Sequence, residues 1–220
     1  MELSWHGHSC VYINTIQNHE ILIDPFITGN PMSDLDLDTL SVDTIIITHA
    51  HADHLGDTVR LARRTLCDVI CNVELAEYLK KEYDLHTHGL NIGGRGKFSF
   101  GSVKFVQAIH SSSYNGLELG LAAGVVIHDD ISTVYHAGDT ALFSDMALVG
   151  KVDICCLPIG DYYTMGIDDA IKAASLIQSD LFIPIHYNTF STIEQNPYEF
   201  INKLPEANGL VPEIGEVIEL

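Results

Sequence analysis

Short apolar runs separated by turn residues predict a series of β-strands in the first part of the chain. Leu3–Trp5, Cys10–Asn14 and Glu20–Asp24 are expected to be strands because these runs are rich in Val, Ile and Tyr. The third run stops before Pro25, since the residue that precedes a proline is disfavoured in a helix and proline lacks a backbone donor. Thr44–Thr48 is continuously apolar between its threonines, which is typical of a strand that is buried on both faces.

Strands and helices alternate after this point. Leu55–Arg64 is predicted to be a helix, Asp68–Asn72 a strand and Val73–Tyr83 a second helix. Lys80 and Lys81 lie in the last turn of that second helix, where positive charge suits the helix dipole. The alternation indicates an α/β protein.

The rest of the chain first changes to hairpins and then returns to the α/β alternation. The elements predicted there are hairpins of Lys97–Phe100 with Ser102–Ile109 and of Leu121–His128 with Ser132–His136, strands at Val152–Ile159 and Leu181–Ile185, helices at Ile167–Gln178 and Gln195–Leu204, and a short strand pair within Gly209–Leu220. Two mixed sheets with helices outside them would bury this pattern. No low-complexity linker interrupts it, so we expect residues 1–220 to form one domain.

Charge narrows the range of partners. The 220 residues include 30 acidic and 11 basic side chains, which gives a formal net charge of −19, and there are 12 histidines. Such a chain repels phosphate backbones and anionic membrane surfaces, so we expect neither nucleic acid nor a membrane as partner. No apolar run approaches the roughly 20 residues of a membrane span, and the first residues lack the features of a signal peptide. We therefore expect a cytoplasmic protein with a small-molecule substrate, and we leave open assembly into a homo-oligomer.

The cysteines do not form a recognisable metal or disulfide pattern. Five are present, an odd number, and they lack the paired spacing of a zinc finger. They lie within apolar stretches, at Cys10, Cys67, Cys71, Cys155 and Cys156. We expect reduced, buried thiols that act as small apolar side chains.

The strongest chemical signal is a loop that follows the predicted strand Thr44–Thr48. It holds His49, His51, Asp53 and His54 in the order His-x-His-x-Asp-His. Neutral imidazole is the commonest protein ligand for divalent transition metals, and residues two apart on extended backbone point to the same side. Four ligands within six residues exceed what one tetrahedral ion needs beside remote ligands, which indicates two ions that share the loop.

Three further candidates stand where predicted strands end. They are His110, Asp139 and His186. Each alone is also compatible with a structural histidine or a turn. The same position, at the end of a predicted strand, occurs three times, and this favours metal ligation. Since every candidate offers nitrogen or oxygen, the expected cofactors are two divalent ions of Zn, Mn, Fe or Ni.

The order of these motifs resembles the metallo-β-lactamase superfamily, and most closely its UPF0173 metal-dependent hydrolase branch, which is related to the ascorbate-6-phosphate lactonases. Other segments that carry the resemblance are Trp5–Ser9, Ile23–Pro31, Asn91–Gly94, His110–Ser113, Tyr135–Thr140, Pro158–Gly160, Thr164–Gly166 and Pro184–Phe190. The resemblance implies a four-layer αββα sandwich of two mixed sheets, with a binuclear metal site at one edge. It also implies a division of the ligands: His49, His51 and His110 for one ion, Asp53, His54 and His186 for the other, and Asp139 as the bridge.

Two metal ions about 3.5–4 Å apart would generate hydroxide at neutral pH and stabilise the charge that develops on the substrate. The expected function is therefore hydrolysis of a small ester, lactone or phosphodiester by a hydroxide held at the two ions. Asp53 is expected also to orient this hydroxide. His6 and His8, which resembling proteins place near the metals, are candidates to protonate the leaving group; the alternative for both is a hydrogen-bonding or structural role.

Several neighbouring residues have two interpretations. Asp24 either hydrogen-bonds a ligand histidine or caps its strand. Candidates for the substrate pocket, or otherwise for loop packing, are Tyr162, Tyr163, Met165, Tyr187 and Asn188. The remaining histidines are expected to be structural or exposed: His136 as a support for a ligand, and His19, His86, His88 and His128 without a role at the metals.

Two other functions compete with the hydrolase. The first is a redox member of the same fold, a di-iron or sulfur oxidoreductase; flavodi-iron relatives usually have Glu where His51 stands and carry a flavin domain, and this chain has neither. The second is a binding protein that has lost its metals, against which the complete set of ligand positions argues.

Overall fold

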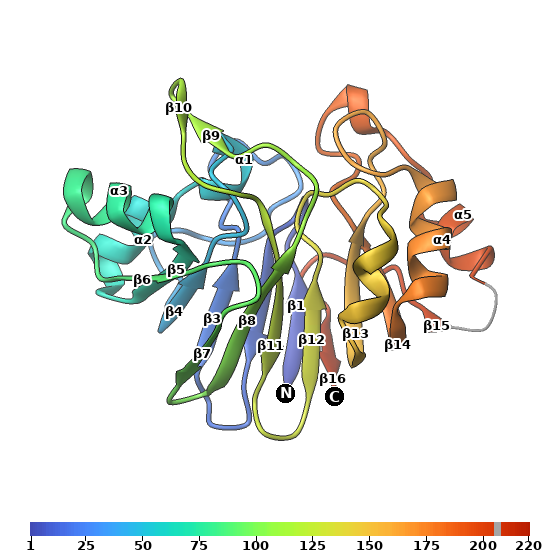
Figure 1. Ribbon diagram of the computed structural model, residues 1–220, viewed down its shortest axis with the longest axis horizontal. Helices are drawn as coiled ribbons and strands as arrows, with labels where there is room; N and C mark the ends of the chain where they lie inside the picture. Colours follow the sequence, from blue (N-terminus) through green and yellow to red (C-terminus); the bar gives the residue numbers. More distant parts are fainter. Residues whose placement is uncertain (205–207) are drawn as a thin grey trace.

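The computed structural model describes residues 1–204 and 208–220, and two β-sheets packed face to face form its centre (Figure 1). The strands of the first sheet, in chain order, are β1 (Glu2–Trp5), β2 (Val11–Asn14), β3 (Glu20–Ile23), β4 (Thr44–Ile46), β5 (Asp68–Asn72), β6 (Thr87–Leu90) and β16 (Val217–Glu219). Those of the second are β7 (Arg95–Phe98), β8 (Gly101–Gln107), β11 (Ala123–His128), β12 (Thr133–His136), β13 (Lys151–Pro158), β14 (Gln178–Ile185) and β15 (Asn208–Gly209). The spatial orders are β16-β1-β2-β3-β4-β5-β6 and β15-β14-β13-β12-β11-β8-β7.

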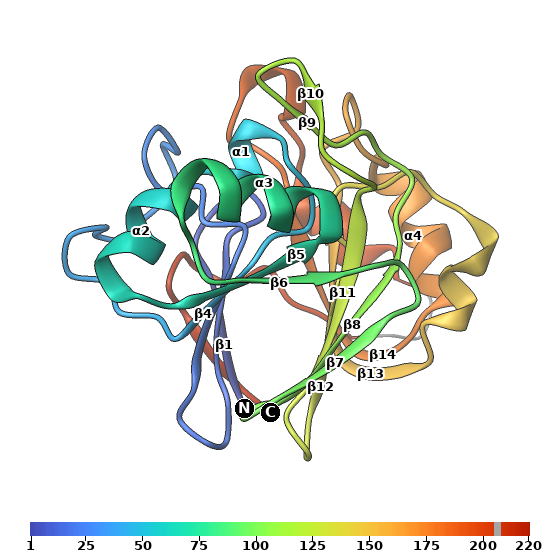
Figure 2. The same cartoon turned by 60° about the vertical axis from the view of Figure 1, so that its left-hand side comes forward.

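Helices cover the outer faces of both sheets (Figure 2). On the first sheet they are α2 (Thr58–Thr65) and α3 (Val73–Tyr83), and on the second α4 (Ile167–Leu176) and α5 (Pro197–Asn202). The single turn α1 (Ala52–Leu55) lies beyond the strand ends of the first sheet (Figure 1). Shorter elements are a hairpin of β9 (Ser113–Tyr114) and β10 (Leu117–Glu118) and two 3-10 turns, η1 (Ser144–Leu148) and η2 (Ser191–Ile193). The arrangement confirms the expected αββα sandwich. Within the described ranges, no helix is long and apolar enough to cross a membrane.

The central strands of the first sheet are buried on both faces. Ile21, Ile23 and Ile46 pack into the core between the two sheets, whereas Leu22 and Ile45 pack into a second core beneath the helices. Side chains alternate between the faces of a strand, so a strand covered on both sides has to be continuously apolar. This is the physical reason for the uninterrupted apolar run at β4.

The predicted helix Leu55–Arg64 is wrong in one important respect, because it is broken into α1 and α2. Gly56 adopts a positive φ of 43°, and a Cβ atom there would lie 2.3 Å from the carbonyl oxygen of Pro25. The Asp57 carboxylate then accepts backbone hydrogen bonds from Ile27 and Thr28, at 3.2 and 2.6 Å. Because of this break, α1 stays with the ligand candidates Asp53 and His54 that it carries, while α2 packs separately on the sheet.

The predicted strand pair at the end of the chain is also wrong. β15 pairs in parallel with β14, whereas β16 pairs antiparallel with β1 in the other sheet. β6 and the β9–β10 hairpin were not predicted, since their residues are short, mostly polar runs without a buried face. β11 and β12 pair antiparallel, which confirms the predicted hairpin of Leu121–His128 with Ser132–His136.

The burial of the cysteines leads to a prediction about their reactivity. All five are free and buried, and burial raises the pKa of Cys156 to about 12 and also raises the pKa of Cys10. Because the thiolate is the reacting species, we expect no labelling of the native protein by Ellman's reagent at about pH 8, and labelling of all five thiols after denaturation. Rapid reaction of a thiol in the native protein would contradict this burial.

Candidate metal centre

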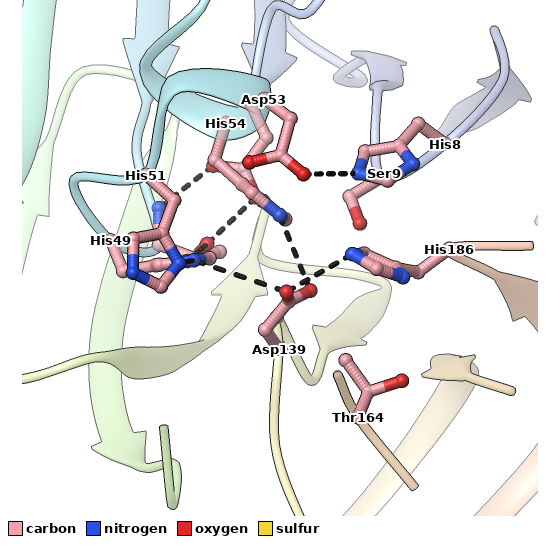
Figure 3. Close-up of polar contacts among 12 residues, drawn as sticks. His8, Ser9, His49, His51, Asp53, His54, Asp139, Thr164 and His186 are labelled. Atoms are coloured by element: carbon pink, nitrogen blue, oxygen red, sulfur yellow. Dashed lines mark hydrogen bonds and ion pairs between the residues drawn. The ribbon is translucent and has the colours of Figure 1, made fainter. Parts of the chain in front are cut away.

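Loops at one end of the two sheets bring the predicted ligands together (Figure 3). β8 and β12 each pair antiparallel with β11, and β12, β13 and β14 are parallel, so β8, β12 and β14 run in the same direction. The ligand candidates follow the carboxyl ends of four strands: His49, His51, Asp53 and His54 after β4, His110 after β8, Asp139 after β12, and His186 after β14. Open α/β sheets commonly place their sites at this end.

The first group of ligand atoms consists of imidazole nitrogens from His49, His51 and His110. Nε2 of His49 lies 2.9 Å from Nδ1 of His51, which lies 3.2 Å from Nε2 of His110. The three residues offer ligand atoms that all lie within 4.8 Å of one another. They could therefore hold one metal ion.

The second group combines Asp53, His54 and His186 with His8. Their ligand atoms also lie within 4.8 Å of one another. The His8 Nε2 atom is 3.1 Å from the Asp53 carboxylate, and the rings of His8 and His186 are 4.0 Å apart between centroids. This group could hold a second ion, with His8 either as a ligand or as a hydrogen-bond donor to Asp53.

Asp139 lies between the two groups. Its Oδ2 atom is 3.0 Å from His186 Nε2 and 3.5 Å from His110 Nε2, and its Oδ1 atom is 3.3 Å from His54 Nε2. Nε2 of His49 is 3.9 Å from Oδ2. One buried carboxylate therefore faces histidines of both groups, which is the position that a bridging ligand requires.

Two polar atoms at the centre have no hydrogen-bond partner. His54 Nε2 and Asp139 Oδ1 are fully buried and face each other without making a hydrogen bond. Buried polar atoms without partners are costly, and a buried nitrogen and oxygen that converge on one point match the donor set of a divalent ion. The residues present thus fit the metals that the sequence predicts.

Asp24 orients two of the histidines. Its Oδ2 atom is 2.7 Å from both Nδ1 of His54 and the hydroxyl of Thr48, and that hydroxyl is 3.0 Å from Nδ1 of His49. A carboxylate only accepts, so Thr48 donates to Asp24 and His49 Nδ1–H donates to Thr48. In their neutral forms, both rings then carry their proton on Nδ1 and present an unprotonated Nε2 to the centre. Of its two interpretations, Asp24 has the role of a hydrogen-bond acceptor for a ligand.

The electrostatics of the centre favour the metal-binding forms of His49 and Asp139 and attract positive charge to His54. Burial, with the neighbouring His54, holds the pKa of His49 well below its ordinary value. Burial alone would raise the pKa of Asp139, but His186 and His54 outweigh it and hold that pKa well below its usual range. Burial opposes charge on His54, yet Asp139 and Asp24 raise its pKa well above normal, because two carboxylates attract a positive charge to this point. His49 and Asp139 are therefore already in their metal-binding forms at neutral pH, whereas His54 has to release its proton from Nε2 when a metal ion binds.

The structure separates His6 from His8. His8 lies at the centre, whereas Nδ1 of His6 is 2.6 Å from Asp34 and its Nε2 is 2.8 Å from the hydroxyl of Ser4. Both ring nitrogens of His6 therefore bond to residues that are not metal-ligand candidates, and the structure does not support a catalytic role for His6. His136 bonds the backbone, with Nε2 3.0 Å from the Ser9 carbonyl, so it supports the turn before Asp139 without touching a ligand.

A cavity of about 610 Å³ opens over the centre. Besides metal-ligand candidates, it is lined by Ser111, Tyr163, Phe190 and Thr192. Tyr163 was a predicted pocket residue, whereas Phe190 and Thr192, just before and within η2, were missed because nothing in the sequence shows that their side chains face the cavity. Other predicted pocket residues lie elsewhere: Tyr162 is largely exposed, Met165 is buried in the core, and Tyr187 stacks on Trp5.

The role of Asp24 can be tested by metal content. Asp24→Asn should lower metal affinity about 10–100-fold, since it replaces one carboxylate oxygen by an NH2 donor, which would face either the backbone N–H of Thr48 or the protons of His54 and the Thr48 hydroxyl. Elemental analysis after dialysis at a series of free metal concentrations measures this loss. Asp34→Asn, which alters the partner of His6, is the matched control and should keep its metal; equal metal loss in both variants would contradict the assignment.

Comparisons with known proteins agree with this geometry. Residues 19–187 match the family described as the beta-lactamase superfamily domain. The chain is 48% identical, over the whole of both sequences, to a UPF0173 metal-dependent hydrolase of Bacillus thuringiensis subsp. konkukian. The structure of Igni18, a metallo hydrolase from the archaeon Ignicoccus hospitalis, matches with a TM-score of 0.90 and 35% identity, covering 99% of this chain and 97% of that one.

A more distant structure shares the fold alone. It is the isothiocyanate hydrolase from Delia radicum gut bacteria, with a TM-score of 0.79 and 21% identity over 100% of this chain and 99% of that one. The full-length match at 48% identity and the family match over residues 19–187 carry the assignment. The chain belongs to the metallo-β-lactamase superfamily and, within it, to the UPF0173 metal-dependent hydrolases.

Proposed function

We propose that this metal-dependent hydrolase uses two divalent metal ions to hydrolyse a small ester, lactone or phosphodiester. The observation that supports two ions is the position of Asp139, whose carboxylate faces His186 and His110 from opposite ligand groups at 3.0 and 3.5 Å. When bound, two such ions acidify a water molecule and polarise the substrate oxygen. His49, His51 and His110 would hold one ion, Asp53, His54 and His186 the other, and Asp139 would bridge them.

His8 positions Asp53 in this proposal. The Asp53 carboxylate can only accept, so the His8 ring carries its proton on Nε2 and donates to Asp53, while Nδ1 accepts from the Thr189 hydroxyl 2.9 Å away. Burial, with the nearby His186, lowers the pKa of His8 to about 4, so the ring is neutral at neutral pH. A neutral ring is a poor acid, and we therefore propose that His8 aims the Asp53 carboxylate at the attacking water.

The cavity walls favour substrates without negative charge. Among the described residues that line the cavity there is neither lysine nor arginine, whereas Phe190 and Tyr163 supply aromatic surface. These walls therefore offer no permanently charged cation to pair with an anionic group of the substrate outside the reacting centre. We therefore propose that neutral esters or lactones with an apolar group are better substrates than anionic phosphodiesters.

Removal of single ligands tests the metal centre. His49→Ala and Asp139→Ala should each lower hydrolytic turnover by at least about 10³-fold, since they disrupt the group that activates water. The purified wild-type protein should contain about two equivalents of metal by elemental analysis. His88→Ala, on an exposed strand, is the control. Full activity in either ligand variant, or oxygen-dependent turnover of iron-loaded protein, would contradict the proposal.

The substrate preference is tested with a matched pair of aryl compounds. We expect a larger rate acceleration over the uncatalysed reaction for p-nitrophenyl acetate than for bis-p-nitrophenyl phosphate. Phe190→Ala should raise KM for the ester about tenfold with a smaller effect on kcat, because it removes aromatic contact area from the bound substrate. Tyr198→Ala, an exposed aromatic residue on α5, is the control. A preference for the phosphodiester would reverse the proposed substrate class.

A further inference from the structure

A second cavity, of about 680 Å³, lies on the outer side of the first sheet and contains none of the proposed metal ligands. Its walls come from α2, the last residue of α3, the last residue of β9 and the junction between α1 and α2. Leu55 and Val59 provide apolar surface, and Tyr83 and Tyr114 provide aromatic surface. The same walls carry the arginines Arg60, Arg63 and Arg64.

The concentration of arginine is unusual for this chain. The chain has four arginines, and Arg95 on β7 is the one outside this cavity. In a chain with a net charge of −19, three arginines in one cavity wall are a local concentration of positive charge. Basic side chains on an exposed helix usually contact only solvent. Whether these three arginines form a binding site therefore depends on the contacts of their guanidinium groups.

Backbone contacts hold two of the arginines in place. Arg63 donates to the carbonyl of Tyr83 at 3.0 Å and lies over the Tyr83 ring, 5.7 Å from its centroid. Arg64 donates to the carbonyl of Leu40. A guanidinium has five N–H donors, so each group keeps most of its donors for another partner.

Carboxylates neutralise this wall only in part. Arg60 pairs with Asp38 at 2.5 Å, but neither Arg63 nor Arg64 forms an ion pair within the described ranges. Asp57, the acidic residue in the cavity wall, accepts backbone hydrogen bonds from Ile27 and Thr28. The wall therefore retains positive charge and free donors beside aromatic and apolar surface.

We propose that this cavity binds a small organic phosphate that carries an aromatic ring, such as a nucleoside monophosphate. Guanidinium groups match phosphate oxygens in geometry and charge, and tyrosine rings offer a surface on which a planar ring stacks. Leu55 and Gly56 in its wall directly follow the α1 residues Asp53 and His54. A ligand bound here thus contacts the chain segment that carries two of the proposed metal ligands.

Calorimetric titration of the metal-containing protein with AMP at low salt tests this proposal. Arg63→Gln/Arg64→Gln keeps an N–H donor at each position but removes both charges, and it should weaken AMP binding at least about tenfold. Lys80→Gln/Lys81→Gln on α3 removes the same charge from exposed positions and should bind AMP like the wild type. Thermal unfolding and metal analysis of each variant establish that the fold and the metal centre are intact.

A second test compares AMP with ligands that lack either its phosphate or its aromatic ring. Adenosine should bind at least about tenfold more weakly than AMP, because it lacks the phosphate. Tyr114→Ala should weaken AMP binding more than the binding of inorganic phosphate, since only AMP has a ring to stack. Equal AMP affinity in the wild type and the arginine variant would overturn the proposal, because the AMP would then be bound at the metals. Absence of AMP binding up to about 1 mM in the wild type would overturn it as well.

Discussion

The metal centre depends on the buried carboxylate of Asp24, which lies at the end of β3 and is fully inaccessible to solvent. It accepts from the backbone and hydroxyl of Thr48 and from the ring of His54, and so ties β3 to the loop that carries the first ligands. An isolated buried charge is strongly unfavourable, so these donors are a condition of the fold as well as of the site. The same interactions fix which nitrogen of His49 and His54 faces the metals.

Backbone conformations around the centre show how tightly it is built. Asp24, His8 and His186 all adopt positive φ, at 47°, 54° and 54°. Non-glycine residues rarely adopt this region, and it persists where surrounding contacts over-determine it. The backbone N–H of His186 donates to the carbonyl of His8 at 2.9 Å, which joins the two sheets directly beside the ligands. Rigid sheet ends rather than long loops therefore set the distances within the site.

The sequence was sufficient for two mixed sheets with helices outside them, because that pattern has local signals, and it named the candidate ligands that the structure brings together. Buried strands such as β4 are continuously apolar, and the ligand loop follows directly along the chain. It was insufficient for contacts between distant segments. Nothing local distinguishes His6 from His8, although one pairs with Asp34 and the other with Asp53, and nothing local shows that Phe190 lines the cavity. The break at Gly56 likewise depends on the close approach of Pro25.

The distribution of charge gives the acidic composition a structural meaning. Asp24 and Asp139 create negative potential inside the protein, around His54 and the proposed metal centre, while the described residues in the walls of the cavity above them include histidines but neither lysine nor arginine. Three of the four arginines are instead gathered on α2, on the outer face of the first sheet. The proposed anion site and the proposed metal centre thus lie in separate cavities. In the two proposals, an anionic ligand and a neutral substrate therefore do not compete for one site.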